Sequence, residues 1–308
     1  MSKTVAVIDL GTNTFHLMIV RLDGVFSVLH REKQPVKLGQ GGINQDKITD
    51  EAMLRAQSCM IRFRDLMERH HVTDIRALGT SALRSAQNAE DVLAQIKAAS
   101  GISVNVISGD EEANYIYHGV KWAAPMGDET SLIVDIGGGS VEFIIANQSK
   151  VFWKQSFDIG AQRLLERFHR HDPIPTEETE ALNRYLHQEL KPLHLAMEDH
   201  RVRTLIGSSG TFDTLSEIYS VRNGLGYSGE APETPLTIKG MHAIHHDLAS
   251  LDRAGRMKMP GMIEMRVDMI VVASCVIQYL LKHFGFERVR VSTYSLKEGV
   301  IARDFLSL

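Results

Sequence analysis

Two stretches of the chain share one arrangement of apolar and polar positions. Residues 4–20 run from an apolar segment through Asp9 and a glycine-containing polar turn into a second apolar segment. Residues 130–146 repeat this arrangement, with Asp135 ending the first apolar run and Gly137 to Ser140 in the turn. Short apolar runs bounded by turn residues indicate β-strands. Each stretch is therefore predicted to form a strand, a turn and a second strand, and the repetition suggests two related domains.

The rest of the chain alternates between strand-like and helix-like patterns. Thr49, followed by two acidic residues, is typical of a helix N-terminus. Strands alternating with helices place the protein in the α/β class. We expect one domain over 1–122 and a second over 123–308, with a last helix, 297–308, packing back on the first. Further strands are predicted at 24–38, 75–78, 102–107, 151–157 and 287–292, helices at 49–70, 89–100, 160–169, 176–197 and 263–284, and a loop at 222–236.

The glycine turn suggests phosphate binding. Three consecutive glycines, Gly137 to Gly139, permit backbone conformations in which successive N–H groups point into one small volume. A carboxylate beside such a turn suits a hydrated divalent cation that bridges to a phosphate. No Lys-Ser/Thr pair follows the glycines, and a strand rather than a helix comes next, so the turn differs from other phosphate loops. The plainer interpretation is two unrelated hairpins.

Composition limits the classes of partner. The 308 residues, 44% hydrophobic and 23% charged, are ordinary for a globular protein of two domains. No apolar run is long enough to span a bilayer and the N-terminus lacks a signal-peptide pattern, so we expect a cytoplasmic protein without a membrane partner. The net charge of -4 argues against a nucleic-acid partner and requires any anion site to be local.

Six segments, in this order along the chain, resemble one known family. They are VIDLGTNTFHLMIV, TSALRSAQN, SGDEEA, VDIGGGSVEF, GSSGTF and RVDMIVVA with VSTYSLKEG. Together they are similar to the exopolyphosphatase/guanosine pentaphosphate phosphatase (Ppx/GppA) family over nearly the whole chain. The resemblance implies two ribonuclease H-like domains of the actin-like ATPase type with a cleft between them. Ser295 and Lys297 stand where glycine and arginine are usual in that family.

The resemblance also implies roles for individual residues. Glu112 would be the catalytic base and Arg84 a clamp on the phosphate, while Asp9 and Asp135 would hold Mg²⁺. Ser209 and Thr211, before a predicted helix, are expected to be weaker substrate contacts unless they only cap that helix. The implied phosphate-binding residues are Asn13, Gly137, Gly138, Gly139, Ser140 and Glu142.

Each of these roles has a structural alternative. Asp110, Glu111 and Glu112 begin a helix, where carboxylates commonly cap N–H groups and offset the helix dipole. Arg84 could be part of a surface ion pair. The hydrolysis of a terminal phosphoryl group needs an oriented water, a group that positions it, and positive charge on the phosphoryl oxygens. The implied set supplies all three, and the resemblance favours Glu112 over Glu111.

The resemblance leaves the substrate open between inorganic polyphosphate and guanosine pentaphosphate. A long chain needs a basic track, for which Arg163, Arg266 and Lys297 are candidates, and the acidic balance favours short chains or a small substrate. Two other classes are weighed: a kinase of the same superfamily, which needs an adenine pocket near GSSGTF, and a sensor that binds nucleotide without turnover. A homodimer is a candidate assembly.

Overall fold

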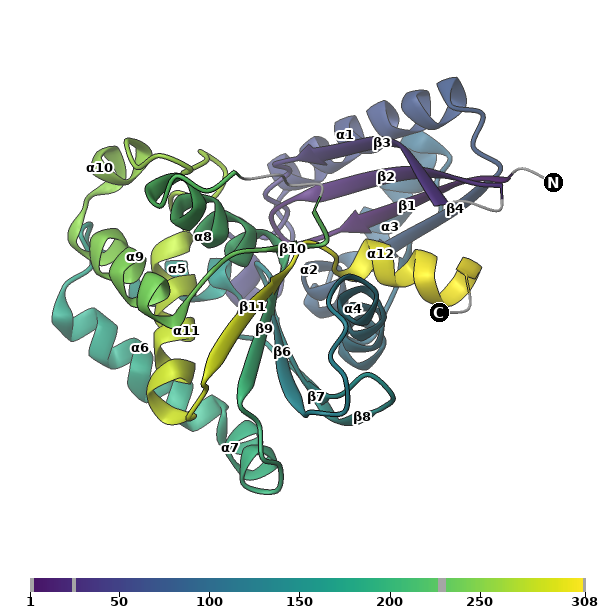
Figure 1. Ribbon diagram of the computed structural model, residues 1–308. Coiled ribbons are helices and arrows are strands. Elements are labelled where there is room, and N and C mark those ends of the chain that lie inside the picture. The colour runs from purple at the N-terminus through teal and green to yellow at the C-terminus, as the bar shows by residue number, and fades with distance from the viewer. Residues whose placement is uncertain (1–2, 24–25, 227–230, 307–308) are drawn as a thin grey trace. The chain divides into compact units, whose positions relative to one another are not determined.

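The computed structural model (Figure 1) describes nearly the whole chain, namely residues 3–23, 26–226 and 231–306. Contacts divide the chain into two compact units, Met1–Glu112 and Ala113–Leu308. Each unit has its own sheet and is described by itself. The division falls inside helix α4 (Gly109–Ala123), whereas the sequence predicted a boundary after residue 122. The predicted domain limits stay a prediction.

The described part of the first unit contains one mixed sheet with the strand order β3-β2-β1-β4-β5. Strands β1, β2 and β3 are antiparallel neighbours, and β4 and β5 run parallel to β1. The predicted hairpin over 4–20 is confirmed, whereas the strand predicted at 102–107 forms only as the two-residue β5. The strands are β1 (Lys3–Leu10), β2 (Phe15–Leu22), β3 (Phe26–Gln34), β4 (Asp74–Gly79) and β5 (Asn105–Val106).

Helix α1 (Asp50–Arg69) confirms the predicted N-terminus. The Thr49 hydroxyl accepts a hydrogen bond from the Ala52 amide at 3.3 Å, which satisfies one of the N–H groups that a helix start leaves without a partner. Ala52, Ala56, Met60 and Phe63 are buried at helical spacing, so one stripe of α1 packs into the core. The shorter helices of this unit are η1 (Ile43–Gln45), α2 (Ser81–Ser85) and α3 (Ala89–Ser100).

The sheet of the second unit has the order β10-β11-β9-β6-β7-β8. Strands β6, β7 and β8 are antiparallel neighbours, β9 and β11 are parallel to β6, and β10 is antiparallel to β11. Every residue of β6 and β7 is buried. The strands are β6 (Ser131–Ile136), β7 (Val141–Ala146), β8 (Val151–Phe157), β9 (Thr204–Ser208), β10 (Glu233–Thr234) and β11 (Arg288–Ser292).

The two sheets follow one plan. In each sheet, three strands that follow one another in the chain are antiparallel neighbours: β1, β2 and β3 in the first, and β6, β7 and β8 in the second. On the free side of the first of these strands, a strand that follows a helix pairs parallel to it: β4 with β1, and β9 with β6. The paired glycine turns lie at the same place in both plans, between the first strand and the second. The α/β class and the repeated strand-turn-strand unit are therefore confirmed.

Helix α11 (Ile270–His283) is the central helix of the second unit. It is buried over most of its length and contacts α5, α6, α8 and α9 (Figure 1). Its apolar composition follows from this position, because a helix surrounded by protein needs no polar face. The other helices are α5 (Ala161–Phe168), α6 (Thr176–Glu189), α7 (Lys191–Glu198), α8 (Ser209–Arg222), α9 (Ile238–Ser250), α10 (Arg253–Met257), α12 (Leu296–Ile301) and a π-helix, η2 (Ala302–Leu306).

Three predictions about this unit were wrong in their limits. The helix predicted at 176–197 is two helices that meet at Leu190, because Pro192 lies in the first turn of the second and cannot continue a helix. The helix predicted at 263–284 begins only at Ile270. The predicted loop at 222–236 includes strand β10, and its residues 227–230 lie outside the described residues. Helices α9 and α10 were not predicted.

Helices α4 and α12 cross with their backbones in contact. A Cβ atom on Gly299 would lie 1.7 Å from the Tyr115 carbonyl oxygen, and one on Gly119 would lie 2.1 Å from the Ser295 carbonyl oxygen. Only glycine permits this approach. The crossing fixes the start of α12, where Ser295 and Glu298 form a reciprocal capping box. Of the predicted last helix, residues 307 and 308 lie outside the described part.

No helix in the described ranges is both long and apolar enough to cross a lipid bilayer.

Candidate active site

The turn between β1 and β2 is held from one side. The carbonyl oxygens of Thr12 and Asn13 accept hydrogen bonds from the amides of Gly39 and Lys37, at 2.9 and 2.8 Å. Because C=O and N–H point in opposite directions across a trans peptide, the N–H groups of these two peptide units point away from the segment 37–39. Asp9 lies one residue before the end of β1, beside this turn.

The glycine turn of the second unit is held in the same way, by the start of α5. The Gly137 carbonyl accepts from the Ala161 amide at 2.9 Å, and the Gly138 carbonyl accepts from the Gln162 amide at 2.8 Å. The Gly139 carbonyl accepts from the Arg163 Nε at 3.0 Å. Three successive carbonyls therefore point toward α5.

The consequence is an aligned set of donors. The N–H groups of Gly138, Gly139 and Ser140 belong to the same three peptide units, so they point to the side opposite α5. Successive N–H groups on one side of a turn form a concave site for an oxyanion. The predicted phosphate loop thus has the backbone orientation that such a loop needs. Gly160 packs directly against the glycine turn, since a Cβ atom on Gly160 would lie 2.4 Å from the carbonyl carbons of Gly138 and Gly139.

Asp135 is a buried carboxylate fixed by two serines. Its Oδ2 accepts hydrogen bonds from the Ser208 and Ser295 hydroxyls, at 2.8 and 2.6 Å, and the residue is 5% exposed. The sequence did not predict that either serine binds Asp135. The signal was there, because Ser208 ends β9, the parallel neighbour of β6, and the carboxyl ends of parallel strands meet at one edge of a sheet.

Glu142 lies opposite Asp135 in the β6–β7 pair and is 1% exposed. Its Oε1 accepts from the hydroxyls of Ser140 and Ser156, both at 2.7 Å. A hydroxyl has one proton to donate, and that of Ser140 goes to Glu142. The group of Ser140 best placed to donate to a phosphate is therefore its main-chain N–H.

The first unit brings the two predicted catalytic residues together. The Arg84 Nη1 donates to the Glu112 Oε2 at 2.9 Å and to the Ile107 carbonyl at 3.2 Å. The side chains are 24% and 10% exposed, so the ion pair is partly buried. It is therefore not the surface ion pair that was the alternative role for Arg84. A cation on α2 and a carboxylate in the first turn of α4 therefore stand side by side.

The structure also separates Glu112 from Glu111. Glu111 accepts from the amide and the hydroxyl of Ser108, both at 3.0 Å, and its own amide donates to the Ser108 hydroxyl. This reciprocal arrangement is a capping box. The capping role considered for the acidic run thus belongs to Glu111, while Glu112 faces Arg84.

Ser209 and Thr211 turn toward the main chain. Their hydroxyls lie 3.4 and 3.5 Å from the Ile136 carbonyl oxygen, at the end of β6. Ser209 has a φ of 67°, which non-glycine residues rarely adopt. Both side chains therefore brace the end of β6 beside the glycine turn, and their role as weaker substrate contacts stays a prediction.

Of the three candidate track residues, Arg266 has the most unusual position. Its guanidinium lies against Gly210 at the start of α8, where a Cβ atom would be 2.0 Å from Nη2. Its Nε is buried and has no hydrogen-bond partner among the described residues. Burial lowers the pKa of Arg266, and the carboxylates of Asp213 and Asp135 oppose that effect. Arg163 instead donates to the glycine turn from behind.

The described residues contain no group of three or more His, Cys, Asp or Glu side chains that could hold a metal ion. This does not conflict with the predicted Mg²⁺. Proteins commonly hold Mg²⁺ through one or two carboxylates, and water and substrate phosphates supply its other ligands. Asp135 suits that pattern, because both serine hydroxyls bind its Oδ2 and neither binds its Oδ1.

Known proteins of one phosphatase family are similar to this chain in sequence and in fold. The profile of the Ppx/GppA phosphatase family matches residues 18–308. A crystal structure of an exopolyphosphatase from Cytophaga hutchinsonii is 42% identical, with a TM-score of 0.96 and 99% of each chain covered. A protein of Haemophilus influenzae named "Putative exopolyphosphatase" is 27% identical over 97% of this chain and 90% of its own length. The Aquifex aeolicus Ppx/GppA structure, 24% identical, has the same fold, with a TM-score of 0.81 over 100% of this chain and 99% of its own.

Proposed function

The chain belongs to the Ppx/GppA phosphatase family, and from that premise we propose that it is an exopolyphosphatase, which hydrolyses the terminal phosphate of inorganic polyphosphate. The names of the Cytophaga and Haemophilus relatives support this choice of substrate. The observation that carries the proposal is the glycine turn, whose carbonyls are bound by the start of α5 so that its amides face away from that helix as donors for a phosphate.

In the proposed reaction, Glu112 and Arg84 are the catalytic side chains. Glu112 orients a water and accepts its proton as the oxygen attacks the terminal phosphorus. The bond from that phosphorus to the bridging oxygen breaks, and the shortened chain leaves with the bonding electrons. Arg84 and the amides of Gly138 and Gly139 stabilise charge on the phosphoryl oxygens. The Arg84–Glu112 contact at 2.9 Å supports a shared role.

We also propose that the reaction uses Mg²⁺, with Asp9 and Asp135 as the protein ligands. A bound Mg²⁺ would neutralise charge on the phosphate oxygens. Ser208 and Ser295 would keep the Asp135 carboxylate in one orientation, because both donate to the same oxygen. Removing Mg²⁺ with a chelator should therefore abolish phosphate release, and adding it back should restore the rate.

Guanosine pentaphosphate is the second candidate substrate, with loss of its 5′-terminal phosphate as the reaction. The observation that favours it is the charge of the chain, 34 basic against 38 acidic residues, which leaves little cationic surface for a long polyanion. The two substrates present the same terminal phosphoanhydride group, so the residues proposed above would serve either one.

The test is phosphate release by the purified chain with Mg²⁺, from polyphosphates of several lengths and from guanosine pentaphosphate. We expect release from polyphosphate, and Glu112→Gln should lower kcat by about 100-fold or more. Glu111→Gln is the matched control, since its carboxylate caps α4, and its kcat should stay within about threefold of the parent. Absence of release from both substrates would refute the proposal. Release from guanosine pentaphosphate alone would select the second candidate.

A further inference from the structure

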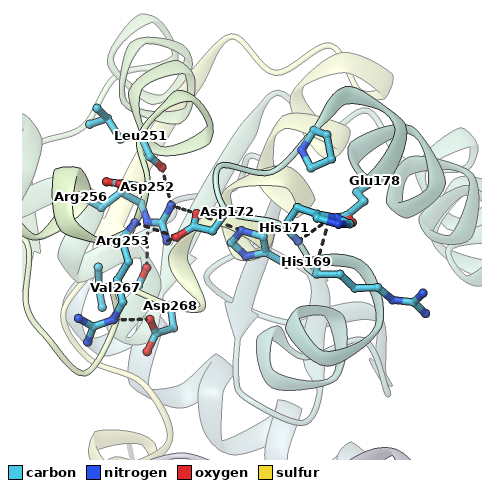
Figure 2. Close-up of polar contacts among 12 residues, drawn as sticks. His169, His171, Asp172, Glu178, Leu251, Asp252, Arg253, Arg256, Val267 and Asp268 are labelled. Atoms are coloured by element: carbon cyan, nitrogen blue, oxygen red, sulfur yellow. Dashed lines mark hydrogen bonds and ion pairs between the residues drawn. The ribbon is translucent and has the colours of Figure 1, made fainter.

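Arg256, on α10, is the largest fully buried side chain among the described residues, at 1% exposure. Its Nη1 and Nη2 donate to the two carboxylate oxygens of Asp172, at 2.6 and 3.1 Å. Nη1 also donates to the Leu251 carbonyl at 2.6 Å, and Nε donates to the Val267 carbonyl at 3.1 Å. Figure 2 shows these contacts converging on one guanidinium. Arg256 thus joins the loop after α5, the end of α9 and the turn before α11.

The acceptor side of this network is equally fixed. The Asp172 Oδ2 also accepts from the Arg253 amide at 2.8 Å, and the His169 Nε2 lies 3.4 Å from Oδ1 (Figure 2). Burial alone raises the pKa of Asp172, but the hydrogen bonds and charge of Arg256 outweigh it and hold the pKa below its usual value. Asp172 is therefore anionic at neutral pH, and the ion pair persists there.

The segment that Arg256 holds carries Arg266. In the segment between α9 and α11, whose residues are all described, the only regular helix is the five-residue α10. The rest of that segment consists of turns and irregular chain. Val267, whose carbonyl binds Arg256, directly follows Arg266. The position of Arg266 against Gly210 therefore depends on how firmly this irregular segment is anchored.

The position of Arg266 opposes stability. The N-terminus of a helix is the positive end of its dipole, so a cation there is repelled. Burial also removes water from the guanidinium, and its Nε meets no acceptor in the described residues. Asp135 and Asp213 offset part of this cost. An unfavourable arrangement that the surrounding structure enforces is characteristic of a functional site, and an oxyanion is the ligand that would relieve it.

We propose that Arg256 is a positioning residue for substrate binding: through the Val267 carbonyl it holds Arg266 over the start of α8, where the guanidinium meets a phosphate oxygen of the substrate. The identity of the substrate rests on the proposed function. The link from Arg256 to Arg266 rests on the contacts alone. Arg256 itself is closed off from any ligand by its four hydrogen bonds.

A double-mutant cycle tests this link. In a Glu112→Gln background, which slows turnover, calorimetry measures the affinity for inorganic tripolyphosphate. Arg256→Met should weaken binding by about tenfold. The same substitution in a chain that already carries Arg266→Met should change the affinity by less than about twofold, because the group that Arg256 positions is gone. If Arg256→Met weakens the affinity by the same factor with and without Arg266→Met, the proposal is wrong.

Arg253→Met is the matched control. Arg253 lies on the same short helix and pairs with Asp268 and Glu264 of the same segment, at 2.9 and 3.6 Å, but its side chain is 49% exposed. Exposed ion pairs contribute little, so affinity should stay within about twofold. Equal losses from Arg253→Met and Arg256→Met would contradict a specific role for the buried arginine.

Kinetics separate positioning from general damage. In the otherwise native chain, Arg256→Met should raise KM for tripolyphosphate by about tenfold and leave kcat within about twofold, the pattern for lost binding that is equal in ground and transition states. A fall in kcat with unchanged KM would refute the proposal. If Arg256→Met does not fold, Arg256→Lys replaces it, since lysine keeps the charge but lacks the planar five-donor fork with which arginine makes its four hydrogen bonds. Failure of hydrolysis would refute the proposed function, while the binding cycle would still decide the link.

Discussion

At the scale of single residues, two neighbouring glutamates have different roles because their partners come from different parts of the chain. Glu111 bonds to Ser108, three residues away, and closes a capping box. Glu112 bonds to Arg84, which is 28 residues away in sequence. A capping partner can be read from local spacing, whereas an ion pair across a fold cannot. The Arg84–Glu112 pair is therefore the clearest gain from the structure at this scale.

The pKa of His245 is likewise set by the residues around it. Its Nδ1 lies 2.8 Å from the Ser274 Oγ. Burial, with smaller contributions from the charges of His242 and His246, lowers its pKa to about 4. Because an unfolded histidine titrates near 6.5, the unfolded chain binds this proton between about pH 6.5 and 4 while the folded chain does not. The contribution to stability is full above that window and is lost as the pH falls through it.

We therefore predict that His245→Gln reduces the pH dependence of folding. The free energy of unfolding of the parent should fall by about 2–3 kcal/mol more than that of the variant between pH 6.5 and 4. Urea unfolding at several pH values measures the difference. His246→Gln is the control, because its side chain is 82% exposed. If both variants flatten the profile equally, burial of His245 is not the cause.

At the scale of elements, the glycine turn and helix α5 work as one piece. The first N–H groups of a helix have no partner inside it, and in α5 the amides of Ala161 and Gln162 donate to the turn. The helix start is satisfied by the turn, and the turn is oriented by the helix. The two segments can approach closely because Gly160 has no side chain. Its φ of -64° is open to any residue, so the constraint is space and not backbone conformation.

Gly160→Ala should displace this turn. The added Cβ would lie 2.4 Å from main-chain carbons of Gly138 and Gly139, which cannot move aside as a flexible side chain would. We expect phosphate release to fall by about 100-fold and stability by about 1–3 kcal/mol. Gly285→Ala is the control, since no atom lies within 4 Å of its added Cβ. Full activity in Gly160→Ala would show that the turn does not bind the reacting phosphate.

Elements without a sharp local signal were the ones predicted poorly. The 176–197 helix was predicted whole because its apolar spacing continues through Leu190, and Pro192 sits where a proline is tolerated, in a first helical turn. The start of α11 was placed too early because residues 263–269 form successive turns whose apolar side chains resemble helical spacing. In both cases the competing signal was tertiary packing of apolar residues, which periodicity alone cannot separate from helix formation.

At the scale of the whole molecule, the repeated sheet plan and the overall charge matter most. Both sheets place an aspartate and a glycine-containing turn at the end of their first strand. The net charge of -4 means that attraction of a polyanion must come from a few local cations, such as Arg84 and Arg266, and not from a broad basic surface. This balance affects how substrate length and salt should influence activity.

We predict that kcat/KM rises with polyphosphate length only over the first few phosphates and then stays level. Raising the ionic strength from about 0.05 to 0.2 M should lower kcat/KM by less than about tenfold, because few charge pairs are screened. Phosphate release from defined-length chains at several salt concentrations measures both effects, with guanosine pentaphosphate as a short reference. A rate that keeps increasing through long chains, with steep salt dependence, would contradict this prediction.

The sequence by itself determined most of the strands, the two turns and the candidate residues on them. Short continuous apolar runs must be buried, and glycine and aspartate interrupt them where the chain turns, so these features are local and readable. The same holds for the Thr49 cap of α1 and for the α/β class. The family of the chain could also be recognised, because its six motifs lie in short continuous segments.

Only the tertiary structure decided which groups meet. Asp135 and its two serines, Glu112 and Arg84, and Arg256 with Asp172 each join segments far apart in the chain. The direction of the glycine-turn amides likewise follows from bonds to α5 and not from the glycines themselves. Such contacts depend on how sheets and helices pack, and packing is a property of the folded chain as a whole.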